Sequence, residues 1–466
     1  MWQTSSLIFI ALDLIGSIAV TIHVLLNKRN VTSAIGWIAL AWFSPFVGAA
    51  LYFAFGINRI KRKALRLRRS EHRRRTRKGL LSRLSKPLAK LETTTSILTH
   101  QDLTTAKISD PLENGDEAYP LMLAAINTAT KTIVLSSYIF RSDKIGQDFV
   151  EALTLAHKRG VMVRVLIDGF GGGVLLAPAY HRLRNQAVPV ALFMSSWLPW
   201  KMQFVNLRLH KKILIVDGQV AFSGGLNISD DNTGGPTNTI KVRDTHFKIE
   251  GPIVKQIALD FMADWLFATN EILPEHIWAP SSNLKATAKA RIITSGPDQE
   301  IEKLYFVFSS ALSVAQKSIK IATPYFLPDD SLMTALKLAA MRGVNVSIVI
   351  PEINDHAFMN WAMAAHIGPL LEAGCHIWRA PQPFNHSKLM TVDDSWCLFG
   401  SPNWDTRSIR LNFELAIEAY DTQLAKQISN IIDQGVTNPL TIEELNRRSI
   451  MIKCRDAAAR LLMPYL

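Results

Sequence analysis

Cysteine is scarce in this chain of 466 residues. Cys375, Cys397 and Cys454 are the three cysteines, and their spacing fits neither a disulfide framework nor a metal site. A low, odd count of this kind indicates a reducing compartment and excludes the small secreted domains that disulfides hold together. We therefore expect all three thiols to be ordinary packing residues.

A general excess of positive charge is also lacking, although the formal net charge is +13. Residues 59–90 contain fifteen Lys or Arg against one acid, Glu71, a net charge of +14, so the rest of the chain is close to neutral. A protein that binds nucleic acid over a broad surface would spread its basic residues more evenly. The distribution instead indicates one basic segment beside an apolar one.

The marks of a cleavable signal peptide are lacking as well, so cleavage is disfavoured as the interpretation of the N-terminal segment. The first apolar stretch, residues 7–26, has neither a basic segment before it nor a small-residue cleavage site after it. A second apolar stretch follows at residues 34–55, and each is long enough to cross about 30 Å of hydrocarbon as a helix. Since the loop between them is short, residues 1–58 are predicted to form a transmembrane helical hairpin.

The charge after the hairpin predicts its orientation. Residues 59–108 begin with the basic run and are expected to form a basic juxtamembrane linker. Under the positive-inside rule this linker and the domains that follow it lie on the cytoplasmic side of the cell membrane, in a multi-pass protein. The basic run serves as a topology signal, as a contact for anionic headgroups, or as both.

An internal repeat organises the remaining chain. Residues 136–168 resemble residues 322–351 once the shared Arg-Gly-Val at 159–161 is aligned with that at 342–344. Each copy contains an apolar strand, an amphipathic helix, a glycine and a second apolar strand. A strand–helix–strand unit of this kind favours two parallel strands with the helix on one face.

The repeat predicts an α/β fold with two similar lobes, each a mixed β-sheet flanked by helices. A polar stretch at residues 280–290 separates them. The last segment has an amphipathic helical pattern, and packing on a lobe is favoured over contact with lipid. The expected boundaries are 109–285 for the first lobe, 286–440 for the second and 441–466 for the C-terminal helix.

One short pattern, His-x-Lys-x4-Asp, occurs once in each lobe. After each lysine, apolar alternation predicts a strand, and a second short strand completes a hairpin that ends in a Gly turn with an Asn. The duplicated residues are His210, Lys212, Asp217, Gly225 and Asn227 in the first copy, and His386, Lys388, Asp393, Ser401 and Asn403 in the second. Because the spacing is the same twice, we interpret the pair as one duplicated site for phosphate-ester chemistry.

These residue types suit attack on a phosphodiester. A neutral imidazole can act as the nucleophile, and a second histidine can act as the acid and then as the base. Two lysines supply the positive charge that the phosphoryl oxygens need, so the predicted site requires no metal and no cofactor. A zinc site is disfavoured because Lys212 and Lys388 would repel the cation. For Asp217 and Asp393 a turn-forming role is favoured over direct chemistry.

At these motifs the chain resembles the phospholipase D superfamily, and more closely its bacterial cardiolipin synthases. The resemblance covers nearly the whole chain and includes residues 323–344 and 400–414. It implies two phospholipase D-like lobes with the active site at their interface, in the bacterial inner membrane. It also implies phosphatidyl transfer between two phosphatidylglycerol molecules, which gives cardiolipin and glycerol through a phosphatidyl-histidine intermediate.

The resemblance implies a role for each site residue. His210 is expected to be the nucleophile and His386 the acid/base, with Lys212, Lys388, Asp217 and Asp393 completing the catalytic set. Asp244 and Glu414 occupy matching places after the motifs and are expected to orient the histidines. The phosphoryl oxygens are expected to be bound by the two lysines and by Asn227, Asn403 and Ser401. Because Ser401 has Gly225 as its counterpart, the two halves are unequal.

Other functions fit the motifs less well. A phospholipase D-type phosphodiesterase, which would use water as the acceptor and release phosphatidic acid, stays open as the alternative because the acceptor site is not legible in sequence. A nuclease is disfavoured by the hairpin and the uneven charge, and an inactive scaffold protein by the intact motifs. The expected partners are phosphatidylglycerol and the anionic membrane surface, with no nucleic acid.

Overall fold

The computed structural model contains two compact units, residues 1–69 with 196–205 and residues 70–195 with 206–466. The basic run and most of the polar stretch at 280–290 lie outside the described residues. The structure describes residues 2–27, 31–44, 46–56, 84–173, 177–194, 207–234, 240–275, 288–296, 302–461 and 463.

The first unit is a helical hairpin, in which α1 and α2 pack against each other. Its small core consists of Val20, Val24, Ala41 and Tyr52. Among the residues that the structure describes, no helix combines the length and the apolarity needed to cross a membrane. The elements of this unit are α1 (Trp2–Asn27), α2 (Val31–Phe43), α3 (Val47–Leu51) and the π-helical turn η1 (Tyr52–Gly56).

Two polar side chains of α1 find partners inside the hairpin. Asp13 Oδ1 accepts a hydrogen bond from the backbone amide of Phe46 at 3.0 Å. His23 Nδ1 lies 2.7 Å from the hydroxyl of Tyr52. These two polar groups are therefore compensated by the second half of the hairpin, as groups removed from water must be.

The second unit is built on one mixed sheet of 16 strands that runs through both lobes. Its path is β20-β14-β13-β11-β16-β17-β19-β10-β1-β9-β7-β6-β3-β4-β5, with β2 paired to β9. The strands of the first lobe are β1 (Thr104–Ile108), β2 (Leu112–Glu113), β3 (Thr132–Ser137), β4 (Met162–Asp168), β5 (Val190–Phe193), β6 (Ile213–Val216), β7 (Val220–Gly224) and β9 (Thr245–Glu250). Those of the second are β10 (Ala288–Ser295), β11 (Ser318–Ala322), β13 (Asn345–Pro351), β14 (His376–Ala380), β16 (Leu389–Val392), β17 (Trp396–Gly400), β19 (Glu414–Tyr420) and β20 (Asn438–Leu440).

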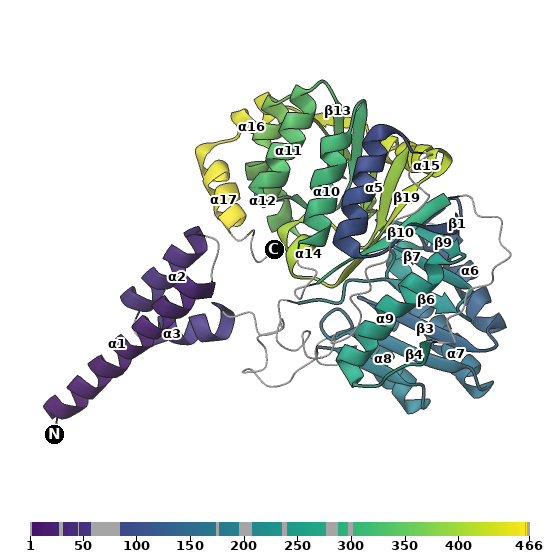
Figure 1. Cartoon of the computed structure of the whole chain (residues 1–466), viewed down its shortest axis with the longest axis horizontal. Helices are drawn as coiled ribbons and strands as arrows, with labels where there is room; N and C mark the ends of the chain where they lie inside the picture. The colour runs from purple at the N-terminus through teal and green to yellow at the C-terminus, as the bar shows by residue number, and fades with distance from the viewer. Residues whose placement is uncertain are drawn as a thin grey trace. The chain divides into compact units, whose positions relative to one another are not determined.

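Helices cover this sheet in both lobes (Figure 1). Those of the first lobe are α6 (Asn114–Thr128), α7 (Lys144–Lys158), α8 (Pro178–Asn185), the 3-10 helix η4 (Asp230–Asn232) and α9 (Ile253–Thr269). Those that pack in the second are α5 (Lys86–Thr99), α10 (Lys303–Val314), α11 (Asp330–Met341), α12 (Ala357–His366), α13 (Gly368–Glu372), α14 (Thr406–Arg410), α15 (Thr422–Asp433), α16 (Ile442–Arg447) and α17 (Ile450–Leu461). The predicted α/β class, with mixed sheet and flanking helices, is confirmed.

The predicted repeat is confirmed strand by strand. In the first lobe β3 and β4 are parallel and joined by α7, and in the second β11 and β13 are parallel and joined by α11. Both helices begin at an aspartate N-cap, Asp143 or Asp329, whose carboxylate accepts an amide hydrogen bond at 3.0 Å. Both are followed by a glycine with φ near +90°, Gly160 or Gly343, which lets the chain turn into the next strand.

Within residues 59–108, which were predicted as a basic juxtamembrane linker, the structure places α5 and β1, and β1 joins the two lobes. Helix α5 packs against α10, and Figure 1 shows its dark blue ribbon beside the green one. Strand β1 pairs with β10 on one side and with β9 on the other. The fully buried Arg291 guanidinium forms an ion pair with Glu418 and donates hydrogen bonds to the carbonyls of Glu92 and Gln101, both at 3.0 Å. These contacts attach α5 to the sheet.

The C-terminal helices pack on the second lobe. Helix α17 lies against α12. The Arg448 side chain bridges the two helices, because it forms an ion pair with Asp456 and donates a hydrogen bond to the carbonyl of Ala364 at 3.0 Å. Arg455 lies over the ring of Trp361, 4.4 Å from its centroid. The expected packing of the C-terminal segment on a lobe therefore agrees with these contacts.

Candidate active site

Both histidine motifs lead into β-hairpins. Strands β6 and β7 are antiparallel, as are β16 and β17, so the two predicted hairpins are confirmed. Each histidine stands three residues before its strand, and that strand runs antiparallel to β3 or β11. His210 and His386 therefore lie at the carboxyl ends of the parallel strands, where α/β sheets commonly bind ligands.

Short backbone bridges join each histidine to the opposite lobe. Leu209 pairs with Phe413, and the amide of His210 donates to the Phe413 carbonyl at 2.9 Å. In the same way β15 (Phe384–Asn385) pairs with β8 (Val242–Arg243), and the amide of His386 donates to the Arg243 carbonyl at 2.7 Å. The residues that follow these bridges are Glu414 and Asp244. Each histidine is thus placed beside the carboxylate of the other lobe.

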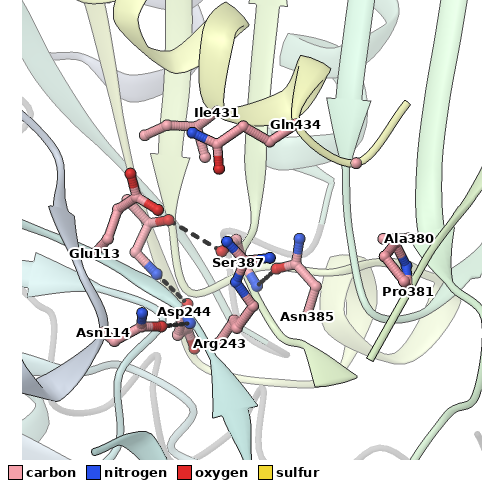
Figure 2. Close-up of a pocket in the computed structure, with 12 residues that line it drawn as sticks. Glu113, Asn114, Arg243, Asp244, Ala380, Pro381, Asn385, Ser387, Ile431 and Gln434 are labelled. Carbon is pink, nitrogen blue, oxygen red and sulfur yellow. Dashed lines mark hydrogen bonds between the residues drawn. The ribbon is translucent and has the colours of Figure 1, made fainter. Parts of the chain in front are cut away.

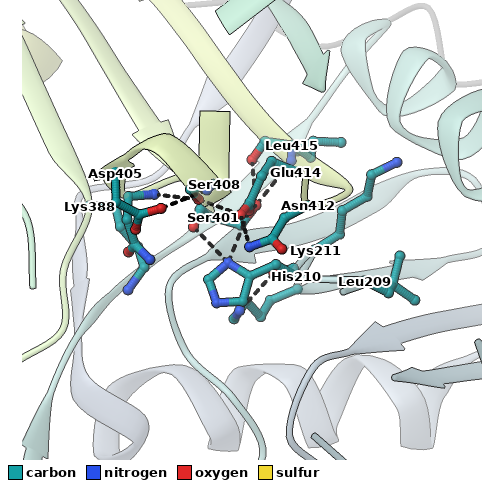
Figure 3. Close-up of polar contacts among 12 residues, drawn as sticks. Leu209, His210, Lys211, Lys388, Ser401, Asp405, Ser408, Asn412, Glu414 and Leu415 are labelled. Carbon is teal, nitrogen blue, oxygen red and sulfur yellow. Dashed lines mark hydrogen bonds and ion pairs between the residues drawn. The ribbon is translucent and has the colours of Figure 1, made fainter. Parts of the chain in front are cut away.

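Glu414 of the second lobe holds His210 of the first (Figure 3). His210 Nδ1 lies 3.0 Å from Glu414 Oε2 and 3.1 Å from the carbonyl of Ser401. Glu414 has no exposed surface, and it also accepts hydrogen bonds from Ser401 Oγ (2.5 Å), Ser408 Oγ (2.5 Å) and Asn412 Nδ2 (3.1 Å). With Nδ1 occupied, Nε2 is the ring nitrogen left for chemistry.

Asp244 of the first lobe holds His386 of the second, with 2.7 Å between Oδ2 and Nδ1. Figure 2 shows the small cavity beside this pair, which both lobes line. Thr245 Oγ1 and Ser387 Oγ lie 3.0 Å apart there and join the lobes directly. A Cβ atom on Gly225 would lie 2.0 Å from Asp244 Oδ1, so the shorter carboxylate needs a glycine where the longer Glu414 has Ser401.

The histidines are uncharged near neutral pH. The pKa of His210 is lowered to about 4. Burial is the main cause and the nearby Lys212 ammonium adds to it, while Glu414 acts in the opposite direction. Burial and Lys388 also lower the pKa of His386. Both pairs are therefore hydrogen bonds from a neutral imidazole to a carboxylate, which fixes the tautomer with Nε2 unprotonated.

The two carboxylates stay ionised in spite of their burial. Burial alone would raise the pKa of Asp244, but the Lys388 ammonium and the hydrogen bond from His386 lower it overall. Burial would likewise raise the pKa of Glu414, and His210 together with Lys212 lowers it. The lysine charges therefore help to keep both carboxylates ionised.

Both motif lysines are buried beside the histidines. Lys212 Nζ donates to the carbonyl of His210 at 2.6 Å, and Lys388 Nζ makes the same contact with the carbonyl of His386. The pKa of Lys212 is lowered to about 7, mainly by burial and in addition by the charge of Lys388. Burial lowers the pKa of Lys388 to about 8, against the effect of Asp244. An anion between the two ammonium groups would restore their charge.

Lys211, between the two motif residues, points the other way. Its ammonium group is buried between Asp260 and Asp264 of α9, at 2.7 and 2.6 Å. Alternation along the chain explains the division, since His210 and Lys212 share one face and Lys211 the opposite one. This ion triad attaches the histidine segment to the helix that covers the first lobe.

Asp217 and Asp393 hold the sheet together at a distance from the histidines. Asp217 accepts hydrogen bonds from the amides of residues 130–132 at the start of β3, at 2.7 to 2.9 Å. Asp393 does the same for residues 316–318 at the start of β11. These contacts match the turn-forming role that the sequence favoured. They give neither carboxylate a contact with the reacting groups, in contrast to the catalytic role also considered.

Of the three residues outside the lysines that were expected to bind phosphate, two line the cavity and one does not. Asn227 and Asn403 line the same cavity as both histidines. Ser401 does not, because its hydroxyl donates to Glu414 and accepts from the amide of Leu415 at 3.0 Å. Ser401 therefore supports the histidine partner, which differs from the predicted contact with phosphate.

The shared cavity has a volume of about 380 Å³ and contains residues that the sequence analysis missed. Tyr138 and Tyr325 follow β3 and β11, and their rings lie edge-on to His210 and His386 at 5.1 and 6.4 Å. Their matching places in the repeat were a signal that could have identified them. The other lining residues are Ile139, Phe170, Arg208, Asp355, His356, Phe358, Met359, Asp405, Arg407 and Asn412.

The lysine pKa values predict a pH dependence. Both lysines are charged and bind phosphate below pH 7, and they lose their charge as the pH rises through about 7 and about 8. We expect kcat/KM for a phosphodiester lipid to fall above about pH 7, by up to tenfold for each unit and for each lysine lost. Lys388→Arg, whose guanidinium stays protonated, should retain only the step of Lys212. A kcat/KM that stays constant up to about pH 9 would contradict this.

Comparisons with known proteins agree with this geometry. The family profile described as "Cardiolipin synthase, PLD-like domain" matches residues 122–265 and 308–435, and that described as "Phospholipase_D-nuclease N-terminal" matches residues 15–56. A crystal structure described as phosphatidylserine synthase, from Haemophilus influenzae Rd KW20, has a TM-score of 0.60 at 17% identity and covers 81% of this chain and 100% of that one. This likeness shows the shared fold.

Two similar proteins have nearly the same length. The "Major cardiolipin synthase ClsA" of Bacillus subtilis (strain 168) is 33% identical over 490 residues, with 99% of each chain covered. A "Cardiolipin synthase" of Staphylococcus aureus (strain Mu50 / ATCC 700699) is 31% identical over 463 residues, with 95% of this chain and 93% of that protein covered. The chain therefore belongs to the bacterial cardiolipin synthases of the phospholipase D superfamily.

Proposed function

We propose that the chain is a cardiolipin synthase, which transfers a phosphatidyl group from one phosphatidylglycerol to another. The observation that carries this proposal is the cavity with both histidines, His210 and His386, on its wall, each oriented by a carboxylate of the other lobe. One phosphate can reach both imidazoles in such a cavity. The full-length similarity to proteins named cardiolipin synthase supports the choice of reaction.

In the first step His210 attacks the phosphorus of the donor lipid. Its Nε2 is unprotonated, and the hydrogen bond to Glu414 stabilises the positive charge that develops on the ring. The bond from phosphorus to the glycerol headgroup breaks. His386, which is neutral before substrate binds, takes up a proton beside the anionic phosphate and delivers it to the departing oxygen. Lys212 and Lys388 stabilise the charge on the phosphoryl oxygens. The products are a phosphatidyl-histidine and free glycerol.

In the second step a terminal hydroxyl of another phosphatidylglycerol attacks the same phosphorus. His386, now neutral, accepts the proton of this hydroxyl, and Asp244 stabilises the imidazolium that forms. The phosphorus–nitrogen bond to His210 breaks, so cardiolipin is released and both histidines return to their starting states. The second step reverses the bond changes of the first, so one phosphate ester replaces another overall. The reaction therefore needs no oxidant and no high-energy donor.

A product assay tests this proposal. Purified full-length protein in detergent, given phosphatidylglycerol alone, should form cardiolipin and glycerol in equal amounts. Phosphatidic acid as the main product would instead identify a phosphodiesterase. His210→Ala and His386→Ala should each lower turnover by about 10³-fold or more, because either change removes a step that the other histidine cannot perform. Robust turnover in either variant would contradict the two-histidine mechanism, and a chelator should leave turnover largely intact.

We also propose that residues 1–58 anchor the protein in the membrane of a bacterial cell, with both lobes on the cytoplasmic side. The hairpin exposes large apolar side chains in its described part, among them Ile15 (63% exposed), Leu26 (79%) and Phe43 (89%). Exposed apolar surface of this kind marks contact with lipid or with protein. The polar groups of Asp13 and His23 have partners inside the hairpin, which lowers the cost of placing them in an apolar surrounding.

Removing residues 1–58 tests the anchor and the predicted domain boundary together. The truncated protein should lose most of its association with vesicles while its two lobes stay folded, because the hairpin has its own core. Flotation with vesicles that contain phosphatidylglycerol measures the first effect, and circular dichroism with thermal unfolding measures the second. Full retention on vesicles would contradict the anchor, and an unfolded remainder would contradict the boundary.

A further inference from the structure

The cavity contains two arginines that are not part of the duplicated site. Arg208 precedes His210 by two residues, and the residue two before His386 is Phe384. Arg407 follows Asn403 by four residues, and the residue four after Asn227 is an aspartate. Both arginines line the cavity together with both histidines. They add positive charge that the symmetric set of histidines, lysines and asparagines does not account for.

Arg208 is a buried cation directed toward this cavity. The residue is 7% exposed, and its guanidinium carbon lies 4.1 Å from the centroid of the Phe170 ring. Nη1 donates a hydrogen bond to the carbonyl of Leu207 at 3.0 Å. The Asp168 charge and a hydrogen bond with Tyr138 act to raise the pKa of this guanidinium, whereas burial lowers it. The effect of burial is the larger one and the pKa of Arg208 is lowered overall, so an anionic ligand in the cavity would stabilise its charge.

The second arginine adds to the positive charge at this wall of the cavity. Arg407 stands on α14, and its charge lies near enough to lower the pKa of Arg208, in addition to the larger effect of burial. Two like charges at one wall of a cavity repel each other, and a bound anion relieves this repulsion. Planar guanidinium groups suit the oxygens of a phosphodiester, to which they can donate two hydrogen bonds at once.

The part of the cavity beside Asp355 is unsuited to a second phosphate. The hydroxyl of Tyr325 donates to the Asp355 carboxylate, with 2.9 Å to either oxygen, and both residues line the cavity. Carboxylates repel phosphate but accept hydrogen bonds from hydroxyl groups. Lys212 and Lys388 are placed for the phosphate that reacts between the histidines. A second phosphate in the cavity therefore has the arginine wall as its place.

We propose that Arg208 and Arg407 bind the phosphodiester of the acceptor lipid. This inference rests on the proposed transfer between two phosphatidylglycerol molecules, of which the acceptor brings its own phosphate, one glycerol unit away from the hydroxyl that attacks. Binding at the arginine wall holds that hydroxyl toward the phosphatidyl-histidine. The same contact selects an anionic lipid over water or free glycerol as the acceptor.

Two water-soluble acceptors test the assignment. Glycerol and glycerophosphoglycerol offer the same terminal hydroxyl, but the second also carries a phosphodiester and neither carries acyl chains. The protein is given isotope-labelled phosphatidylglycerol as the donor, and mass spectrometry measures kcat/KM for each acceptor. We expect the unaltered protein to prefer glycerophosphoglycerol by roughly 10- to 100-fold, the range for charge-assisted hydrogen bonds. Arg208→Gln and Arg407→Gln should each lower this preference by about tenfold.

Arg410→Gln is the matched control on the same helix. Arg410 pairs with Asp329 at 2.8 Å and is not among the residues that line the cavity, so the preference should remain. An unaltered protein without preference would overturn the proposal. An equal loss with both acceptors in the two glutamine variants would also overturn it, because the arginines would then serve the reacting phosphate. Failure of the proposed function gives a different result, namely phosphatidic acid as the product of the unaltered protein with every acceptor.

Discussion

The site depends on two hydrogen bonds that cross between the lobes. His210 of the first lobe is held by Glu414 of the second, and His386 of the second by Asp244 of the first. A backbone bridge immediately before each pair fixes its distance. Neither lobe alone contains an oriented histidine, so the chemistry requires both halves of the chain in their native arrangement. Strand β1 maintains this arrangement, because it pairs with β9 of the first lobe and with β10 of the second. Helix α5 packs beside it on α10 of the second lobe.

The same crossing explains the electrostatics of the site. Buried carboxylates and buried lysines are each costly, and the cost is offset only when they lie close together with their hydrogen bonds satisfied. Glu414 accepts four side-chain hydrogen bonds, and Asp244 lies against Lys388. Burial lowers the pKa of Lys212 and Lys388, to about 7 and about 8, so their positive charge is only weakly favoured near neutral pH. In the proposed reaction a phosphate near the two ammonium groups supplies a counter-charge, so substrate binding would also stabilise the lysine charges.

Local pattern was enough to predict much of the fold and to mark the two histidines that the structure places on one cavity. The strand–helix–strand repeat, the two hairpins and the duplicated motif follow from periodicity and spacing within about 40 residues. The crossed pairing did not follow, because it joins His210 to a residue 204 positions away. The support of Glu414 by Ser401 and the burial of Arg208 were also missed, because each depends on which side of a turn or strand faces the other lobe. The packing of α5 on the second lobe was not predicted, because its residues follow the basic run and were assigned to the linker.

The most direct test of the crossed arrangement is nuclear magnetic resonance of the protein labelled with ¹⁵N at histidine. Glu414→Gln should change the Nδ1–H signal of His210 and leave that of His386 in place, whereas Asp244→Asn should have the opposite effect, because each carboxylate accepts from the histidine of the other lobe. His210→Ala and His386→Ala assign the two signals. A Glu414→Gln variant that changes the signal of His386 and spares that of His210 would contradict the account.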